Sequence, residues 1–280
     1  EIGSGLVGSE MCIRDRYQGA GKTVCVPGLN CYSCPAASGA CPIGAFQAVV
    51  GSSKFSFSYY ITGFLILLGV LLGRFICGFL CPFGWFQELL HKIPTKKFST
   101  KKLKPLRYLK YAVLLVMVFL LPAFLVNDVG MGDPFFCKYL CPQGVMEGAI
   151  PLSLANSGIR SALGSLFTWK FGILLAVIVL SVIFYRPFCK WLCPLGAFYA
   201  LFNRVSLFQI KVDKNKCVSC GKCAKACKMD VDVTKAPNHT ECIRCGMCIR
   251  TCPTGAVRFR YGFGDGKDKT KAAKKAAEKQ

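Results

Sequence analysis

The chain is poor in histidine and in acidic side chains. Its two histidines, His91 and His239, lie far apart, so the sequence offers no pair of axial ligands for a haem between membrane helices. It also contains no glycine-rich phosphate loop, no dinucleotide fingerprint and no arrangement of nucleophile, base and acid that indicates hydrolysis. We therefore expect no haem, no bound nucleotide and no catalytic residues of the chain's own.

The charge balance is strongly basic. Against 14 Asp and Glu residues stand 36 Lys and Arg, which gives a net charge of +22. A nucleic-acid partner would explain such a charge, but the sequence contains no nucleic-acid recognition motif. The composition favours a membrane instead, because 53% of the residues are hydrophobic and the mean hydropathy is +0.42. These values are too apolar for a soluble globular protein of this length.

Eight cysteines near the C-terminus follow the spacing of a bacterial two-cluster ferredoxin. The runs Cys217–Cys227 and Cys242–Cys252 each read C-x2-C-x2-C-x3-C, a pattern in which the fourth cysteine of each run ligates the other cluster. Zinc is the alternative, but two full runs are far more typical of iron–sulfur proteins. The sequence thus predicts one [4Fe–4S] cluster on Cys217, Cys220, Cys223 and Cys252, and a second on Cys242, Cys245, Cys248 and Cys227.

Three apolar segments, residues 55–73, 109–126 and 166–185, come close to the ~20 residues that cross a hydrocarbon core. Buried helices of a soluble core are the alternative, but three such segments without polar faces favour membrane spans. Residues 88–110 hold seven Lys and one Arg against one acid, whereas residues 127–168 hold two basic and three acidic residues. The positive-inside rule therefore places residues 88–110 and the ferredoxin segment in the cytoplasm, the reducing side that cluster thiolates need.

A second cysteine pattern, Cys-x3-Cys-Pro-x-Gly, recurs in the apolar part. It begins at Cys77, Cys137 and Cys189, after each apolar segment, and a partial copy begins at Cys41. Cysteines four residues apart lie on one helical face. The proline disfavours continued helix before it, and the glycine permits a turn. Each unit, called a CxxxCP unit below, therefore predicts a helix end that presents two thiols.

Two of these units share the predicted cytoplasmic boundary. Arg74 and Arg186 precede them by three residues, where a cation would offset thiolate charge and lower the cysteine pKa. The hypothesis is a further iron–sulfur centre, and the alternative is buried, inert thiols; the cysteines are Cys77, Cys81, Cys189 and Cys193. On the outer side, a cluster, disulfides and a dithiol–disulfide cycle all remain open for Cys31, Cys34, Cys41, Cys137 and Cys141.

These patterns divide the chain into five parts. Residues 1–16 are neither a signal peptide nor a span and are expected not to be native. Residues 17–54 form a Cys-rich segment expected outside the cytoplasm, with a native first span missing before it. Residues 55–207 form the transmembrane domain, 208–262 the ferredoxin-like domain and 263–280 a basic disordered tail. The expected fold is mainly α, with polytopic transmembrane helices, CxxxCP helix ends and a small α+β two-cluster bacterial ferredoxin-like C-terminal domain.

Together, the segment PGLNCYSCPAASGACPIGAFQ, the CxxxCP units and the eight-cysteine C-terminal segment resemble the NapH-type polyferredoxin membrane proteins. The NosR-type and CcoG-type membrane iron–sulfur proteins carry the same CxxxCP elements. The likeness extends over residues 24–258. It implies an integral protein of the cytoplasmic membrane that moves electrons between a membrane or cytosolic donor and a partner redox protein.

The sequence therefore predicts an electron-transfer component of an oxidoreductase system rather than a stand-alone enzyme. Quinol or a cytosolic protein is the expected donor, and the basic charge suits an acidic partner such as a ferredoxin or flavodoxin. Two other functions remain open. The CxxxCP thiols would also suit Cu(I) in a metal-handling or cofactor-maturation factor. A redox-sensing regulatory membrane protein is the second, although the sequence contains no sensory or DNA-binding module.

Overall fold

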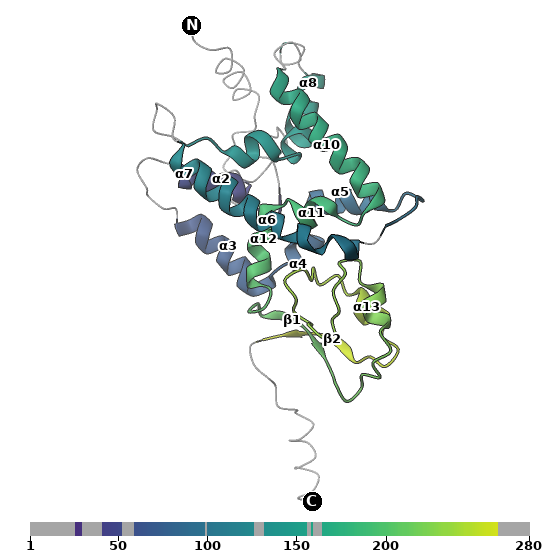
Figure 1. Ribbon diagram of the computed structural model, residues 1–280. Coiled ribbons are helices and arrows are strands. Elements are labelled where there is room, and N and C mark those ends of the chain that lie inside the picture. The colour runs from purple at the N-terminus through teal and green to yellow at the C-terminus, as the bar shows by residue number, and fades with distance from the viewer. Residues whose placement is uncertain are drawn as a thin grey trace, which may run out of the picture.

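The computed structural model describes residues 26–29, 41–51, 59–98, 100–125, 132–155, 158 and 164–262. Within them helices dominate, and the only sheet is one antiparallel pair of strands (Figure 1). The mainly helical fold is thus confirmed for the described chain. The predicted first and last parts of the chain, as well as Cys31 and Cys34, lie outside the described residues.

In the described part of the chain, two helices are long and apolar enough to cross a membrane. One covers Leu103–Phe124 and the other, α10, covers Ser165–Ile183. They coincide with the second and third of the predicted apolar segments. The first segment is described only as α3, Tyr59–Leu72, which is shorter than a membrane span.

The first of the two long helices changes its winding along its length. It starts within η2 (Thr100–Tyr108), a 3-10 helix, and continues as α6 (Leu109–Val113). The wider, π-helical η3 (Leu114–Leu120) comes next, and α7 (Leu121–Phe124) ends the helix. Pro122 accounts for the widening, because proline has no N–H and its ring crowds the carbonyl one turn earlier.

Each CxxxCP unit interrupts the helix at the cysteine that precedes its proline. Cys41, Cys81, Cys141 and Cys193 all have extended backbone, with ψ of 125°, 114°, 111° and 112°. At three of the four, the following proline begins the next helix, where no N–H is required. The helices around the units are α2 (Pro42–Val50), α4 (Phe75–Phe79), α5 (Pro82–His91), η4 (Phe136–Leu140), η5 (Gly144–Ala149), α8 (Ile150–Ala155), α11 (Pro187–Trp191) and α12 (Pro194–Phe202).

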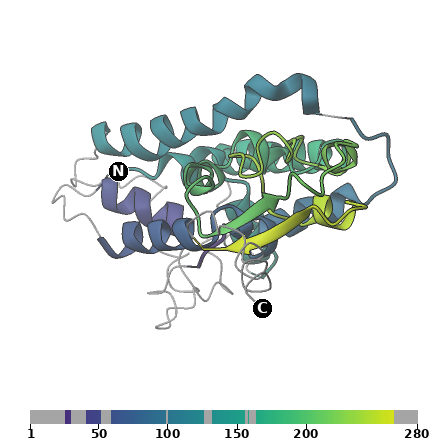
Figure 2. The ribbon, with the colours of Figure 1, turned by 90° about the horizontal axis from the view of Figure 1, so that it is seen from below.

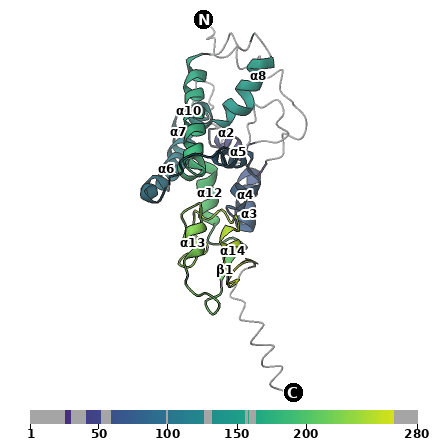
Figure 3. The ribbon, with the colours of Figure 1, turned by 90° about the vertical axis from the view of Figure 1, so that its right-hand side faces the viewer.

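The C-terminal lobe lies at one end of the helical part, next to α4 and α12 (Figures 1 and 3). It is bounded by β1 (Phe208–Val212) and β2 (Val257–Tyr261), which pair with Ile210 opposite Phe259. Seen from below, the two strands lie across the helices behind them (Figure 2).

The two cysteine runs of this lobe have the same backbone shape. Ser219 and Arg244 are left-handed, with φ of 52° and 54°, and each is followed two residues later by a left-handed glycine, Gly221 or Gly246. The short helices α13 (Lys222–Ala226) and α14 (Met247–Arg250) begin directly after these glycines. Each run therefore turns its first two cysteines and its helix around one centre.

The lobe contacts the first CxxxCP unit backbone to backbone. Gly78 lies inside the unit Cys77–Cys81, and a Cβ built on it would lie 2.9 Å from the carbonyl oxygen of Ile243. Ile243 in turn lies inside the cysteine run Cys242–Cys252. A glycine is needed here because any side chain would push the two cysteine loops apart.

We expect Gly78→Ala to lower the stability of the protein by about 1–3 kcal/mol, the usual cost of overpacking. Gly63→Ala, in α3, is the matched control because a Cβ at Gly63 would meet no atom within 4 Å. Thermal unfolding of the purified variants measures the effect. Equal unfolding temperatures for Gly78→Ala and the parent would show that the two loops do not depend on this contact.

Candidate iron–sulfur sites

Two cavities of the C-terminal lobe are lined by four cysteines apiece. In both, the fourth cysteine of one run lies with the first three cysteines of the other, as the spacing predicts. The chemistry of four thiols around one closed space fits a [4Fe–4S] cluster. The first cavity is lined by Cys217, Cys220, Cys223 and Cys252, and the second by Cys227, Cys242, Cys245 and Cys248.

The cysteines around each cavity do not converge on one point, as the ligands of a single metal ion would. In the described part of the chain, no three His, Cys, Asp or Glu side chains converge closely enough to share one ion. A zinc site needs four ligand atoms about 2–2.3 Å from one metal. A cubane instead spreads its thiolates over four irons, which suits cysteines spaced around a larger cavity.

The second cavity is more deeply buried than the first. Cys242 and Cys248 are buried, whereas Cys220, on the first cavity, is exposed. Burial raises the pKa of the Cys242 thiol to about 11 and that of Cys248 to about 12, because a thiolate is poorly solvated there. Without a metal these thiols are neutral at pH 7, so cluster assembly must release their protons.

The first and third CxxxCP units come together beside this lobe. Their four cysteines are buried, with exposed fractions between 6% and 8%. Burial, together with the neighbouring Cys189 and Cys77, raises the pKa of Cys81 to about 12. Burial and the same neighbours raise the pKa of Cys193. The structure therefore brings together the four predicted inner cysteines, Cys77, Cys81, Cys189 and Cys193.

Arg74 and Arg186 hold the two units together reciprocally. Arg74, before the first unit, donates to the carbonyl oxygen of Cys189 in the third at 3.4 Å. Arg186, before the third unit, donates to the carbonyl oxygen of Cys77 in the first at 2.6 Å. Gly84 makes room for this contact, because a Cβ there would lie 2.9 Å from the Cys77 carbonyl oxygen. Each arginine thus fixes the opposite cysteine loop.

The prediction that these arginines lower the pKa of the cysteines is only partly right. Arg74 and Arg186 do favour the Cys77 thiolate, but burial has the larger effect and raises the pKa of Cys77. The sequence suggested the cations and could not give the depth of the site. The arginines therefore act on backbone geometry and offset part of the charge that a bound cluster would bring.

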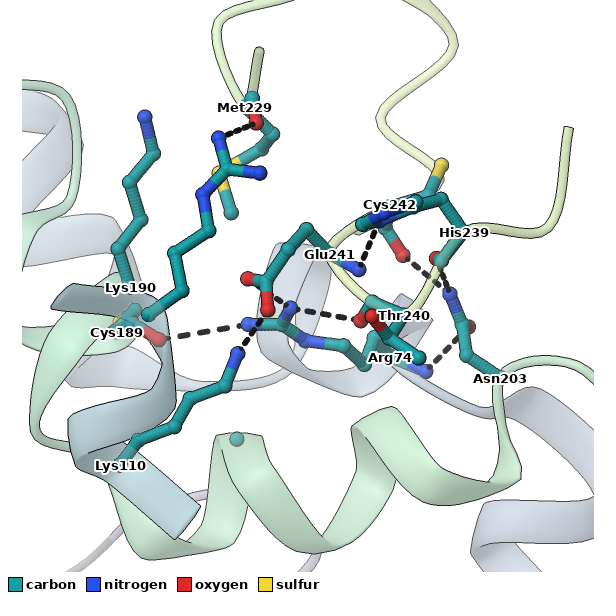
Figure 4. Close-up of polar contacts among 12 residues, drawn as sticks. Arg74, Lys110, Cys189, Lys190, Asn203, Met229, His239, Thr240, Glu241 and Cys242 are labelled. Carbon is teal, nitrogen blue, oxygen red and sulfur yellow. Dashed lines mark hydrogen bonds and ion pairs between the residues drawn. The ribbon is translucent and has the colours of Figure 1, made fainter. Parts of the chain in front are cut away.

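A buried carboxylate connects the inner cysteines to the second cavity (Figure 4). Glu241, the residue before Cys242, accepts a hydrogen bond from Arg74 at 2.8 Å and another from Lys110. Burial alone would raise the pKa of Glu241, but the two cations hold it at about 2. Arg74 also donates to the carbonyl oxygen of Thr240 at 2.9 Å. The Arg74 guanidinium thus donates to backbone carbonyl oxygens both at the inner cysteines and next to the second cavity.

Further polar side chains tie the lobe to the helices. The Asn203 amide donates to the carbonyl oxygens of His239, at 2.6 Å, and Cys242, at 3.0 Å. Arg244, between Cys242 and Cys245, donates to the carbonyl oxygen of Leu72 at 2.6 Å. Sequence reasoning missed Glu241, Lys110, Asn203 and Arg244. A lysine within an apolar segment was the one visible signal, since a buried cation needs an acidic partner.

The outer cysteines are described in part. A Cβ on Gly44, in the partial unit, would lie 3.8 Å from Cys41 Cβ and 3.9 Å from Cys137 Sγ. The structure therefore places Cys41 and Cys137 close together, and Cys141 lies buried at the end of η4. Cys31 and Cys34, the other predicted outer residues, lie outside the described part of the chain.

Comparison with known proteins agrees with this arrangement. A family model described as a 4Fe–4S binding domain matches residues 39–59, 56–101, 110–150 and 166–215, which include the CxxxCP units. A second model with the same description matches residues 210–231 and 236–258, the two ferredoxin runs. [4Fe–4S] clusters are therefore confirmed as the cofactors. No solved structure matches the chain significantly.

Individual proteins are also similar in sequence to this chain. An uncharacterized protein of Methanocaldococcus jannaschii is 32% identical over 71% of this chain and 77% of its own length. YccM of Escherichia coli, named for electron transport, is 28% identical over 61% of this chain and 45% of its own. The regulatory protein NosR of Stutzerimonas stutzeri is 28% identical over 57% of this chain, but over only 21% of its own length.

Fold, cysteine geometry and relatives define an iron–sulfur electron-transfer protein. The chain belongs to the 4Fe–4S binding family of NapH- and NosR-type ferredoxin proteins. The resemblance inferred from the sequence is thus confirmed.

We expect Glu241→Gln to destabilise the protein by about 3–5 kcal/mol, because it leaves Arg74 and Lys110 buried without a balancing charge. Asp232→Asn is the control, since the Asp232 carboxylate bonds within its own turn, to Thr234 and the Lys235 backbone. Thermal unfolding, followed by loss of the cluster absorption, gives the difference. An unfolding temperature for Glu241→Gln equal to that of the control would contradict the role of this carboxylate.

Proposed function

We propose that the chain is a membrane-bound electron carrier in which CxxxCP centres and two ferredoxin clusters form one continuous path. The observation that carries the proposal is the contact between Gly78 and the Ile243 carbonyl oxygen. It joins a loop of the inner CxxxCP cysteines to a loop of the second ferredoxin cavity. One-electron transfer between clusters needs short separation and no acid or base, and this contact supplies the short separation.

The proposed ligands follow from the cysteine sets that line each site. The ferredoxin-like domain, residues 208–262, holds two clusters on the crossed sets described above. The membrane domain, residues 55–207, holds a third centre on Cys77, Cys81, Cys189 and Cys193. On the outer side, Cys41, Cys137 and Cys141, with Cys31 and Cys34, form either a further cluster or redox-active thiols. No step in this scheme requires a catalytic side chain of the chain.

A multi-pass location in the cytoplasmic membrane is part of the proposal. The two long apolar helices support it, and the Lys-rich stretch over residues 88–110 supports a cytoplasmic position for the ferredoxin domain. In this orientation the inner CxxxCP centre lies at the boundary between membrane and cytoplasm. Electrons would pass between this centre and the second ferredoxin cluster, then the first.

The partner on the cytoplasmic side is proposed to be an acidic redox protein such as a ferredoxin or flavodoxin. The first ferredoxin cavity is the exposed one, and Val218 on its rim is 65% exposed. Four exposed lysines lie within the same run or just before it, so an acidic surface would be attracted there: Lys214, Lys216, Lys222 and Lys225. Quinol is the proposed donor or acceptor at the membrane end.

Iron analysis tests the ligand assignment. We expect Cys81→Ser and Cys193→Ser each to lose about four irons, the content of one cluster, while the ferredoxin EPR signals remain. Cys252→Ser is the matched variant, because it should remove a ferredoxin cluster and leave the inner centre. Full iron content in Cys81→Ser and Cys193→Ser would show that these thiols are structural. Stoichiometric copper in place of iron would favour a metal-handling function.

Reporter fusions test the orientation. A reporter fused after Lys104 should behave as cytoplasmic, and one fused after Ala155 should behave as external, because basic loops remain inside. Fusion after Tyr261 should give the same cytoplasmic result as Lys104. The reverse labelling of the first two positions would reject the proposed topology and the reducing location of the clusters.

A further inference from the structure

Two of the four CxxxCP units share a glutamine that the cysteine chemistry does not require. The partial first copy reads CPIGAFQ over residues 41–47, and the inner unit reads CPFGWFQ over residues 81–87. The other two copies read CPQGVME and CPLGAFY, and end in Glu147 and Tyr199 instead. At this position, six residues after the cysteine that precedes the proline, each pair of facing units therefore contains one glutamine.

Both glutamines are fully buried and point at a facing cysteine. Gln87 and Gln47 each have an exposed fraction of 0%. Gln87 Nε2 lies 3.2 Å from Cys189 Sγ, and Gln47 Nε2 lies 3.7 Å from Cys137 Sγ. In both cases the sulfur belongs to the first cysteine of the facing unit. A buried amide is costly unless it is hydrogen-bonded, so the same contact at two places indicates a purpose beyond packing.

The orientation of the Gln87 amide follows from its other contacts. Its Oε1 accepts a hydrogen bond from the backbone N–H of Phe188 at 3.2 Å, and a backbone N–H can only donate. The oxygen must therefore face Phe188, which leaves the NH₂ group facing the Cys189 sulfur. Nε2 also lies 3.3 Å from the carbonyl oxygen of Phe83. Gln87 thus bridges the two inner units next to one proposed ligand.

We propose that Gln87 and Gln47 are positioning residues that raise the reduction potentials of the inner and outer CxxxCP centres through N–H···S hydrogen bonds. The inference rests on the proposed cluster at the inner cysteines and, for Gln47, on the cluster alternative at the outer ones. When a cluster gains an electron, negative charge on its thiolates increases, and an N–H dipole aimed at the sulfur stabilises the reduced state. Hydrogen bonds to cluster sulfurs are one of the factors that set the potential of such centres.

In the inner pair, the facing unit carries a tyrosine in place of the glutamine. Tyr199 occupies the equivalent position in the third unit, and its hydroxyl donates to the carbonyl oxygen of Pro27 at 3.1 Å. At this position of the unit, each pair thus has an amide on one side only.

Redox titration of the full-length protein, followed by EPR, tests the inference. Gln87→Met keeps the size of the side chain and removes its donor, so the midpoint potential of the inner centre should fall. We expect a tenfold change in the ratio of reduced to oxidised centre, which for one electron is about 59 mV. Gln47→Met should shift the outer centre and leave the inner one unchanged. Leu89→Met, at an exposed position of the same helix, is the control and should shift neither centre.

Iron content separates this inference from the function on which it rests. If the parent protein holds no iron at the CxxxCP cysteines, the proposed clusters fail, and this inference fails with them. If the variants keep parental iron and parental potentials, only the role of the glutamines is overturned. Should Gln87→Met lose iron, Gln87→Glu decides, because its carboxylate still accepts from Phe188 and cannot donate. An unchanged potential in Gln87→Glu would then overturn the inference.

Discussion

The structure depends on one buried charge network, in which Glu241 lies between Arg74 and Lys110. Arg74 lies just before the first CxxxCP unit, Lys110 lies in an apolar helix, and Glu241 lies in the ferredoxin lobe. None of them would be stable in a buried position alone, since an unpaired internal charge is costly. The network therefore fixes the lobe on the helices in one position, with the Cys242 loop against the Cys77 loop. The close approach of Gly78 to Ile243 is a consequence of that position.

The CxxxCP unit both breaks the helix at its cysteines and leaves room for an arginine from the facing side. Its proline ends the helix at the second cysteine and starts the next helix, so both thiols lie at a break in the backbone. Its glycine leaves room for an arginine from the facing unit, which bonds to a cysteine carbonyl oxygen, as Arg186 does beside Gly84. Two units placed face to face thus build a four-thiol site from local geometry. In the inner pair, these arginines precede each unit by three residues.

Much of this could be predicted from the sequence. The ferredoxin spacing is local, so it indicated the crossed sets that line the two cavities, and the helix ends follow from proline alone. Contacts between distant residues could not be predicted, because no local pattern links Lys110 to Glu241 or Gln87 to Cys189. The depth of the inner site was also missed: the arginines lower the pKa of Cys77 as expected, but burial raises it more. The apolar pattern indicated three spans, whereas the described part of the chain contains two helices of sufficient length.

The central claim is that the inner CxxxCP centre and the second ferredoxin cluster lie close enough to form one electron path. Pulsed EPR of the fully reduced, intact protein measures this most directly, through the magnetic coupling between reduced clusters. The account predicts a coupled signal that involves the inner centre and disappears in Cys193→Ser, while the coupling between the two ferredoxin clusters remains. A spectrum of the parent protein that shows the ferredoxin pair alone, unchanged by Cys193→Ser, would contradict it.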